Sequence, residues 1–299
     1  MKKKNSTVQR KKVKFDNKYL KDPKIKKIYL TFKKQLYSQI KNEKFCIGVS
    51  GGPDSLALAF LGKVFSKEFN SKFIALIIDH NLRKQSGIEA RKVKKILTKH
   101  KIRTKILTWK GKIPKSNIQF NARNIRYFLL NKECNKLNIK NLVLAHHEGD
   151  LIENFFIRLF RGSGLKGLSS LNIKRHSENN ILNLIRPLIN TKKNELIYIS
   201  KKVFKFYLTD PSNFKEKFLR TRIRNYLDKF KLDGLDINKV KLTLSNLQSA
   251  NESINFYKEK SIKNYVRYLQ HNSCFVSYGL LRFLLFLLRI FPLSDIRRL

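Results

Sequence analysis

The sequence predicts an α/β fold, with a Rossmann-like parallel sheet followed by a small helical domain. Short apolar runs at 45–49, 73–79, 104–109 and 142–145 alternate with segments of helical periodicity. Such alternation is typical of a parallel sheet with helical crossovers. A glycine turn, Ser50-Gly51-Gly52-Pro53-Asp54-Ser55, joins the first run to a helix. After about residue 226 the glycine turns thin out and the pattern becomes helical.

The elements follow in order along the chain. Residues 1–24 are lysine-rich with little apolar content, which predicts a disordered basic arm. A domain over 25–225 then begins with a helix at 25–42, where Ile28, Phe32, Leu36 and Ile40 share a periodicity. Its further helices are expected over 56–65, 87–100 and 117–137. The remaining part, 226–299, is expected to hold helices over 227–255, 256–269 and 279–291.

The charge of the chain is strongly positive. Lysine and arginine number 65 against 21 acids, a formal net charge of +44. This favours a polyanionic partner, nucleic acid first, although a coding bias toward AT-rich codons would also raise the lysine content. A membrane partner is not expected, because no lipidation motif or signal peptide is present and the apolar run 279–293 is too short to span a bilayer.

The number and spacing of the cysteines indicate the cellular compartment and whether a cysteine-bound metal is expected. Cys46, Cys134 and Cys274 lie far apart and form no Cys-x-x-Cys pair. Neither a disulfide framework nor a zinc site is therefore indicated, and a reducing, cytoplasmic compartment is expected. The sequence leaves the oligomeric state open, with a homodimer as one option.

The glycine turn has the features of an anion site. It lies between a buried strand and a helix N-terminus, so backbone N–H groups and the positive end of the helix dipole would point at phosphate. Gly51 and Gly52 are expected to adopt angles closed to other residues. Pro53 suits the first helical turn, and Ser50 and Ser55 offer hydroxyls. Asp54 offers a carboxylate that could help to bind a metal ion coordinated by the phosphates.

Polar residues also follow two other strands. Asp79-His80 comes after the second and His146-His147 after the fourth, and ligands bind at the carboxyl ends of parallel strands. Asp79 and His80 are thus expected to line a nucleotide pocket. A metal site held by both His146 and His147 is not expected, because adjacent residues of a strand point to opposite faces.

Charged residues in three further segments complete the candidate set. Asp150 and Glu153, spaced i,i+3, would share a helix face and hold Mg²⁺ or a cationic amine. Arg123 and Arg126 also lie at i,i+3, and one of them could neutralise a triphosphate. Arginines suited to planar or bidentate contacts with phosphates stand near two turns: Arg161, Arg220, Arg222 and Arg224.

Together these residues resemble the tRNA(Ile)-lysidine synthase family, a group of PP-loop ATPases with an adenine nucleotide alpha hydrolase-like fold. The resemblance runs in order from Phe45 to Arg224 and is weak beyond about residue 226. Its motifs are S-G-G-x-D-S, D-H-x-L-R, N-I-Q-x-x-A-R-x-x-R-Y, A-H-H-x-x-D-x-x-E, R-x-x-R-G-S-G-L-x-G-L, R-P-L, D-P-S-N and R-x-R-I-R. The family more often has D-D-Q-x-E-T where this chain reads Gly149-Asp150-Leu151-Ile152-Glu153-Asn154.

The resemblance implies an ATP- and Mg²⁺-dependent ligase acting on the wobble cytidine of the isoleucine tRNA with a CAU anticodon. ATP would adenylylate the oxygen on carbon 2 of cytosine and release pyrophosphate. The ε-amine of free L-lysine would then displace AMP, giving lysidine. The implied catalytic residues are Asp54, Arg123, Asp150 and Glu153. The implied ATP contacts are Ser50 to Ser55 with Asp79 and His80. The implied tRNA contacts are Arg161, Arg220, Arg222 and Arg224, and the helical region 226–299 is also expected to contact tRNA.

Two other classes of function stay open at this stage. Another PP-loop enzyme, such as a tRNA thiolase or an amidotransferase-type synthetase, would share the loop. Thiolases use paired or clustered cysteines, which this sequence does not offer. A non-catalytic basic RNA-binding protein would need neither the loop nor the acidic pair, and it would not turn over ATP.

Overall fold

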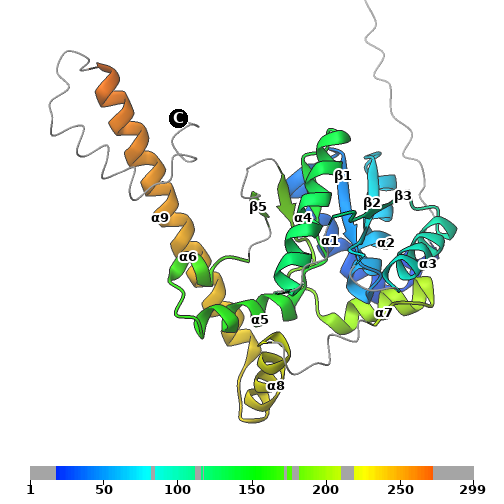
Figure 1. Ribbon diagram of the computed structural model, residues 1–299. Coiled ribbons are helices and arrows are strands. Elements are labelled where there is room, and N and C mark those ends of the chain that lie inside the picture. The colour runs from blue at the N-terminus through cyan, green and yellow to red at the C-terminus, as the bar shows by residue number, and fades with distance from the viewer. Residues whose placement is uncertain are drawn as a thin grey trace, which may run out of the picture. The chain divides into compact units, whose positions relative to one another are not determined.

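The computed structural model describes residues 18–81, 85–111, 116, 118–171, 174–176, 182–209 and 219–271. The chain divides into two compact units (Figure 1). The first contains residues 1–163 and 170–236, and the second contains 164–169 and 237–299. The boundary predicted near residue 226 stays a prediction.

The first unit is built on one six-stranded sheet with the order β3-β2-β1-β4-β6-β5. Strands β1 to β4 and β6 run parallel, and β5 pairs antiparallel at the edge. The strand bounds are Phe45–Val49 (β1), Phe73–Asp79 (β2), Thr104–Thr108 (β3), Asn141–Val143 (β4), Lys174–His176 (β5) and Asn183–Ile185 (β6). The predicted parallel α/β sheet is confirmed, while β5 and β6 were not predicted.

Alternate strand residues feed two apolar clusters, one on each face of the sheet. Phe45, Ile47 and Val49 of β1 pack with α1 (Pro23–Ile40), α2 (Pro53–Glu68), α3 (Ser86–Lys99) and α7 (Lys193–Phe204). Cys46 points the other way and packs with α4 (Ile118–Lys136). Ten residues of α2 are buried, because this helix is apolar almost all round. The glycine turn is thus anchored at both ends by buried elements.

Regular structure begins before the predicted end of the basic arm. A short 3₁₀ helix spans Lys18–Lys21, and Asp22 caps α1 by accepting from the N–H groups of Lys24 and Ile25 at 2.9 and 3.2 Å. Asp22 and Pro23 form a cap followed by a proline at the first helical position, a standard helix start. The rest of the arm, residues 1–17, lies outside the described residues.

The helices after residue 218 differ from the predicted ones. Helix α8 (Leu219–Leu232) begins earlier than expected and ends before Gly234, whose φ is +94°. Helix α9 (Ile237–His271) is continuous where two helices were predicted, since 237–271 contains neither glycine nor proline. In the second unit α9 contacts α6 (Leu165–Leu168). The helix predicted over 279–291 lies outside the described residues. No helix within the described ranges is long and apolar enough to cross a membrane.

Candidate active site

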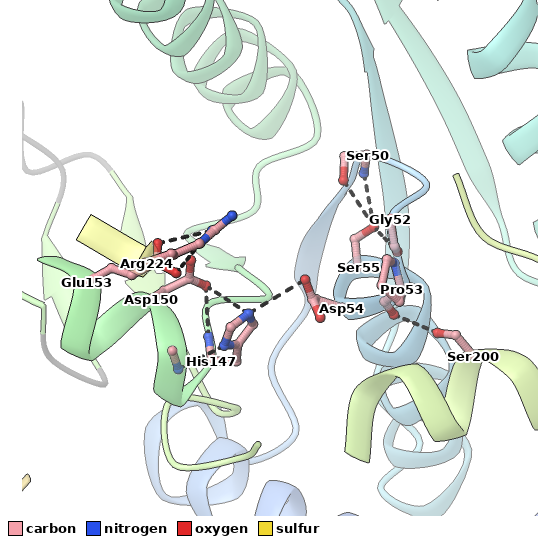
Figure 2. A network of polar contacts seen from close by, with 11 residues as sticks. Ser50, Gly52, Pro53, Asp54, Ser55, His147, Asp150, Glu153, Ser200 and Arg224 are labelled. Carbon is pink, nitrogen blue, oxygen red and sulfur yellow. Dashed lines mark hydrogen bonds and ion pairs between the residues drawn. The ribbon is translucent and has the colours of Figure 1, made fainter. Parts of the chain in front are cut away.

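The glycine turn connects β1 to α2 and is held in one conformation. Gly51 has a φ of +88°, and a Cβ there would lie 2.5 Å from Val93 Cγ2. The hydroxyl of Ser55 accepts from the N–H group of Ser50 at 3.2 Å and donates to the carbonyl of Gly52 at 3.0 Å (Figure 2). It also accepts from the N–H group of Gly51 at 3.2 Å. Gly51 therefore needs to be glycine. The same expectation for Gly52 is wrong, because its φ of −69° is open to any residue.

The start of α2 offers N–H groups to an anion. Pro53 is in the first helical turn, as predicted, and Gly52 is the N-cap residue, with no side-chain hydrogen bond capping this helix start. The first N–H groups of a helix have no partner within the helix. Together with the helix dipole they form a site for a phosphate or pyrophosphate.

The turn lies at the topological switch point of the sheet. From β1 the chain goes to β2 and β3 on one side, whereas β4 and β6 lie on the other side. In parallel sheets this point opens a crevice beyond the carboxyl ends of the strands. Asp54 follows β1, and His147 and Asp150 follow β4 at the start of α5 (Glu148–Leu159). Residues from two neighbouring strands are thereby brought together.

His147 lies between two carboxylates. Its Nε2 is 3.8 Å from Asp54 Oδ2 and 3.7 Å from Asp150 Oδ2 (Figure 2). Its Nδ1 accepts from the N–H of Gly149 at 3.0 Å. An accepting Nδ1 carries no proton, so a neutral ring carries its proton on Nε2, the atom that faces both acids. This hydrogen bond fixes the orientation of the buried imidazole.

The two carboxylates differ in pKa. Burial raises the pKa of Asp54, the charge of Asp150 adds to the rise, and His147 opposes it. Burial also disfavours the charged form of Asp150, but the neighbouring His147 and His146 rings and the hydrogen bond from the His147 N–H, 3.1 Å long, hold its pKa below the usual range. Asp150 is thus the stable anion of the pair, and Asp54 is the one that gains most from a nearby cation.

Three buried polar atoms near this edge have no hydrogen-bond partner among the described residues. They are Asp54 Oδ1, His80 Nδ1 and His146 Nδ1. Each comes from the segment that directly follows β1, β2 or β4, which are adjacent strands. Buried polar atoms are normally satisfied, so three unsatisfied ones after adjacent strands indicate that a polar ligand binds here.

Both of these histidines are held neutral. Burial lowers the pKa of His80 to about 4, and the charge of Arg126 adds to the effect. Burial likewise lowers the pKa of His146, assisted by Arg186, Arg123 and Arg220. A neutral imidazole can donate or accept a hydrogen bond and adds no positive charge to those of the neighbouring arginines.

Asp79, predicted to contact ATP, has structural partners here. Its Oδ1 accepts from the Ser86 hydroxyl at 2.6 Å and from the Asn81 N–H at 3.0 Å. These bonds shape the turn from β2 toward α3. Contact of Asp79 and His80 with ATP stays a prediction.

Glu153 and Arg224, predicted for two different ligands, bind each other. Arg224 Nε donates to Glu153 Oε1 at 2.5 Å and Nη2 donates to Oε2 at 3.1 Å (Figure 2). Glu153 is buried, with 6% of its surface exposed. The ion pair joins α5 to α8. The hydrogen bond with Glu153 raises the pKa of Arg224. In this structure both groups therefore stabilise the site.

The remaining predicted arginines lie on the surface. Arg123 is exposed on α4 and stacks over the Tyr127 ring at 5.0 Å. Arg161 is exposed just after α5, where the N–H of Ser163 donates to the carbonyl of Arg158 in a helix C-cap. Arg220 and Arg222 are exposed on α8. Contacts of these residues with phosphate stay predictions.

The site fits Mg²⁺ in one limited way. Mg²⁺ is commonly held by one or two carboxylates together with substrate phosphates. Asp54, with its unsatisfied Oδ1 beside the glycine turn, suits this arrangement. Within the described ranges, no group of three or more His, Cys, Asp or Glu residues could hold a metal ion on its own.

Sequence reasoning missed several supporting residues. It gave His147 no role, although its ring joins the two acids. A Cβ on Gly149 would lie 2.8 Å from His147 Cε1, so the departure from the family pattern at Gly149 makes room for the ring. Ser200 of α7 donates to the Pro53 carbonyl at 2.6 Å, and the Leu208 N–H donates to the Gly51 carbonyl at 2.9 Å. No local pattern marks Ser200 or Leu208.

Comparisons with known proteins agree with this geometry. A PP-loop domain model matches residues 25–230. The chain is similar to a tRNA(Ile)-lysidine synthase of Orientia tsutsugamushi (strain Boryong), with 39% identity over 75% of this chain and 53% of that protein. It is similar to a tRNA(Ile)-lysidine synthase of Rickettsia bellii (strain OSU 85-389), with 40% identity over 62% of this chain and 43% of that protein. The chain thus spans about half the length of these curated relatives.

A solved structure shares the fold. The U34-tRNA thiolase NcsA from Methanococcus maripaludis, solved with its [4Fe-4S] cluster, superposes with a TM-score of 0.64. The match covers 78% of this chain and 80% of that one at 20% sequence identity. At this identity the likeness concerns the arrangement of strands and helices.

Proposed function

The chain belongs to the PP-loop domain family, and from that premise we propose that it is an ATP-dependent tRNA-modifying ligase that makes lysidine. In this proposal it joins free L-lysine to carbon 2 of the wobble cytidine in the isoleucine tRNA with a CAU anticodon. AMP and pyrophosphate are released. The names of the relatives in Orientia and Rickettsia support the substrate. The proposed compartment is the cytoplasm, as the cysteine usage suggests.

One observation supports the proposal: the glycine turn with Asp54 and the α5 start with Asp150 meet at His147, across the switch point between β1 and β4. The turn suits a nucleotide, and the acids suit a cation. An enzyme that uses ATP to activate a base for attack by lysine needs both sites side by side.

The turn would bind the pyrophosphate part of ATP. The N–H groups at the start of α2 and the helix dipole would stabilise the charge of the leaving pyrophosphate. Arg123, exposed on α4 near His146, would help to neutralise the triphosphate. Asp54 would hold Mg²⁺, which when bound spreads the charge that develops on the phosphates.

Asp150 would bind the lysine side chain. Its carboxylate is held ionised by its neighbours, which suits a bound ammonium group better than it suits removal of a proton. Glu153 acts in this proposal through Arg224, which it holds beside Asp150 and Asp54; both acids act on the pKa of that arginine. The target cytidine must leave the anticodon stack to reach this crevice.

The geometry gives less support to sulfur chemistry. Cys46 and Cys134 are buried in the apolar cluster beneath α4, each with none of its surface exposed. The hydrogen bond with Cys134, together with burial, raises the pKa of the Cys46 thiol, which disfavours the reactive thiolate. Cys274 lies outside the described residues. A thiolase that depends on clustered thiols is therefore the weaker candidate.

The test is pyrophosphate release by the purified chain with ATP, L-lysine and a transcript of the CAU isoleucine tRNA. We expect release to depend on the tRNA and mass spectrometry to find lysidine at the wobble position. A transcript with a GAU anticodon is the matched control and should give no product. Release that ignores the wobble base, or a thiolated product, would contradict the proposal.

A further inference from the structure

The outer face of α4 carries exposed rings among positive charges. Phe120 and Phe128 have 65% and 55% of their surface exposed. With the exposed Asn124 they recur every four residues, so they form one ridge of the helix. Arg123 and Tyr127 form the adjoining ridge, where the guanidinium lies 5.0 Å from the ring centre. Large exposed aromatic rings on one helix face are unusual and indicate a partner.

The charge on this helix selects the kind of partner. Along α4 the only acid is Glu133, which is buried and accepts from Lys105 Nζ at 2.7 and 2.8 Å. Arg123 and Arg126 are exposed on the same helix. A face of aromatic rings with the exposed Arg123 and without a free carboxylate complements single-stranded nucleic acid, in which bases stack on rings and phosphates meet cations.

The face adjoins the candidate active site. Trp109 directly follows β3, and its N–H donates to the carbonyl of Asp79 at 2.9 Å. The Phe128 ring meets the Trp109 ring edge-on at 6.0 Å, which places Phe128 near the carboxyl end of the sheet. The later residues Leu130 and Cys134 pack beneath the strands. The two turns before Phe128 therefore extend past that edge, about 12 Å along the helix axis.

We infer that Phe120 and Phe128 form a stacking surface for unpaired RNA bases next to the reacting one. The inference rests on the proposed function, because a base drawn out of the anticodon stack leaves its neighbours unstacked as well. Rings about 12 Å apart receive different bases and hold the loop open while one base enters the crevice. The rings act by position and stacking, and they take no part in the chemistry.

The experiment compares the full-length chain with Phe120→Ala, Phe128→Ala and the double variant. The probe is a fluorescent anticodon stem-loop RNA with a CAU loop, and its binding is measured by anisotropy without ATP or lysine. We expect each substitution to weaken binding by about 5- to 150-fold. The dependence of log K on log salt should keep its slope, because no charge is removed. The variant Phe120→Trp, which keeps an aromatic ring at this position, should bind the RNA as tightly as the wild type does.

Three controls keep the outcome sharp. Tyr37→Ala removes a ring from α1 that is 45% exposed and also packs on one other ring, Phe69, and it should leave binding unchanged. A duplex RNA of equal length should bind all variants equally. Phe120→Leu, which keeps apolar contact without a π face, should bind as weakly as Phe120→Ala.

Several results would overturn the inference. Unchanged stem-loop binding by the double variant would do so, as would an equal loss on duplex RNA or full binding by Phe120→Leu. Unchanged RNA binding together with a loss of dimers in sedimentation would assign the face to a second copy of the chain. Failure of the proposed reaction is separate: the wild type would bind the stem-loop through these rings and yet form no lysidine.

Discussion

The ion pair between Glu153 and Arg224 gives the sharpest quantitative prediction. Glu153→Gln, Arg224→Gln and the double variant form a double-mutant cycle, because each single change removes one charge of the pair. The two side chains come from α5 and α8, and they are 71 residues apart in the sequence. Their coupling therefore reports tertiary structure and not a local helix preference.

The magnitude follows from the unequal burial of the partners. Breaking a fully buried pair costs about 3–5 kcal/mol, since it leaves an uncompensated charge. The Arg224 side chain is 32% exposed and the Glu153 side chain 8%. Water can solvate the arginine that Glu153→Gln leaves behind, so we expect a loss of about 2–3 kcal/mol. Arg224→Gln leaves the more buried Glu153 carboxylate without its partner, so it should lower the free energy of unfolding by about 3–4 kcal/mol.

The assay is urea unfolding followed by circular dichroism, with the slope m checked for constancy across the four proteins. We expect a coupling energy of about 2 kcal/mol. Asp228→Asn is the matched control, because Asp228 pairs with Lys231 at 2.7 Å on the surface of α8. Its loss should stay below about 0.5 kcal/mol.

A coupling below about 0.5 kcal/mol would refute this reasoning, since that value is typical of a surface pair. Normal stability of Glu153→Gln together with a raised KM for lysine would assign Glu153 to the substrate directly. In that case the contact with Arg224 would be incidental, and both acids would serve the amine.

Four further predictions concern the site and the arm. Gly51→Ala should lower stability by about 2 kcal/mol or more through backbone strain and clash, whereas Gly52→Ala should change thermal unfolding little. Asp54→Asn should reduce tRNA-dependent pyrophosphate release by roughly 100-fold or more while the melting temperature holds. His80 binds a proton more weakly in the folded chain, so stability should fall by up to about 3 kcal/mol from pH 6.5 to pH 4, and His80→Asn should flatten that fall in urea titrations. Deleting residues 1–17 should weaken tRNA binding and lower its salt slope, as filter binding at several salt concentrations would measure.

The sequence predicted those features that depend on short stretches of chain. The runs at 45–49 and 73–79 match β1 and β2, because strands covered by helices on both faces read as continuous apolar segments. The turn after β1 was recognisable, since glycine and proline mark a strand-to-helix turn. Strands β5 and β6, of three residues each, are too short to show any periodicity.

The arrangement of the site was decided by tertiary structure. The spacing alone predicted that Asp150 and Glu153 share one helix face. It could not show that Glu153 forms an ion pair with Arg224. It could not show that His147 turns back onto the Gly149 N–H and faces Asp54, almost a hundred residues earlier. Local sequence determines which residues form a helix, a strand or a turn, because those depend on backbone preference and periodicity. Which charges meet depends on how the strands are ordered in the sheet, and that order is fixed by packing between distant segments.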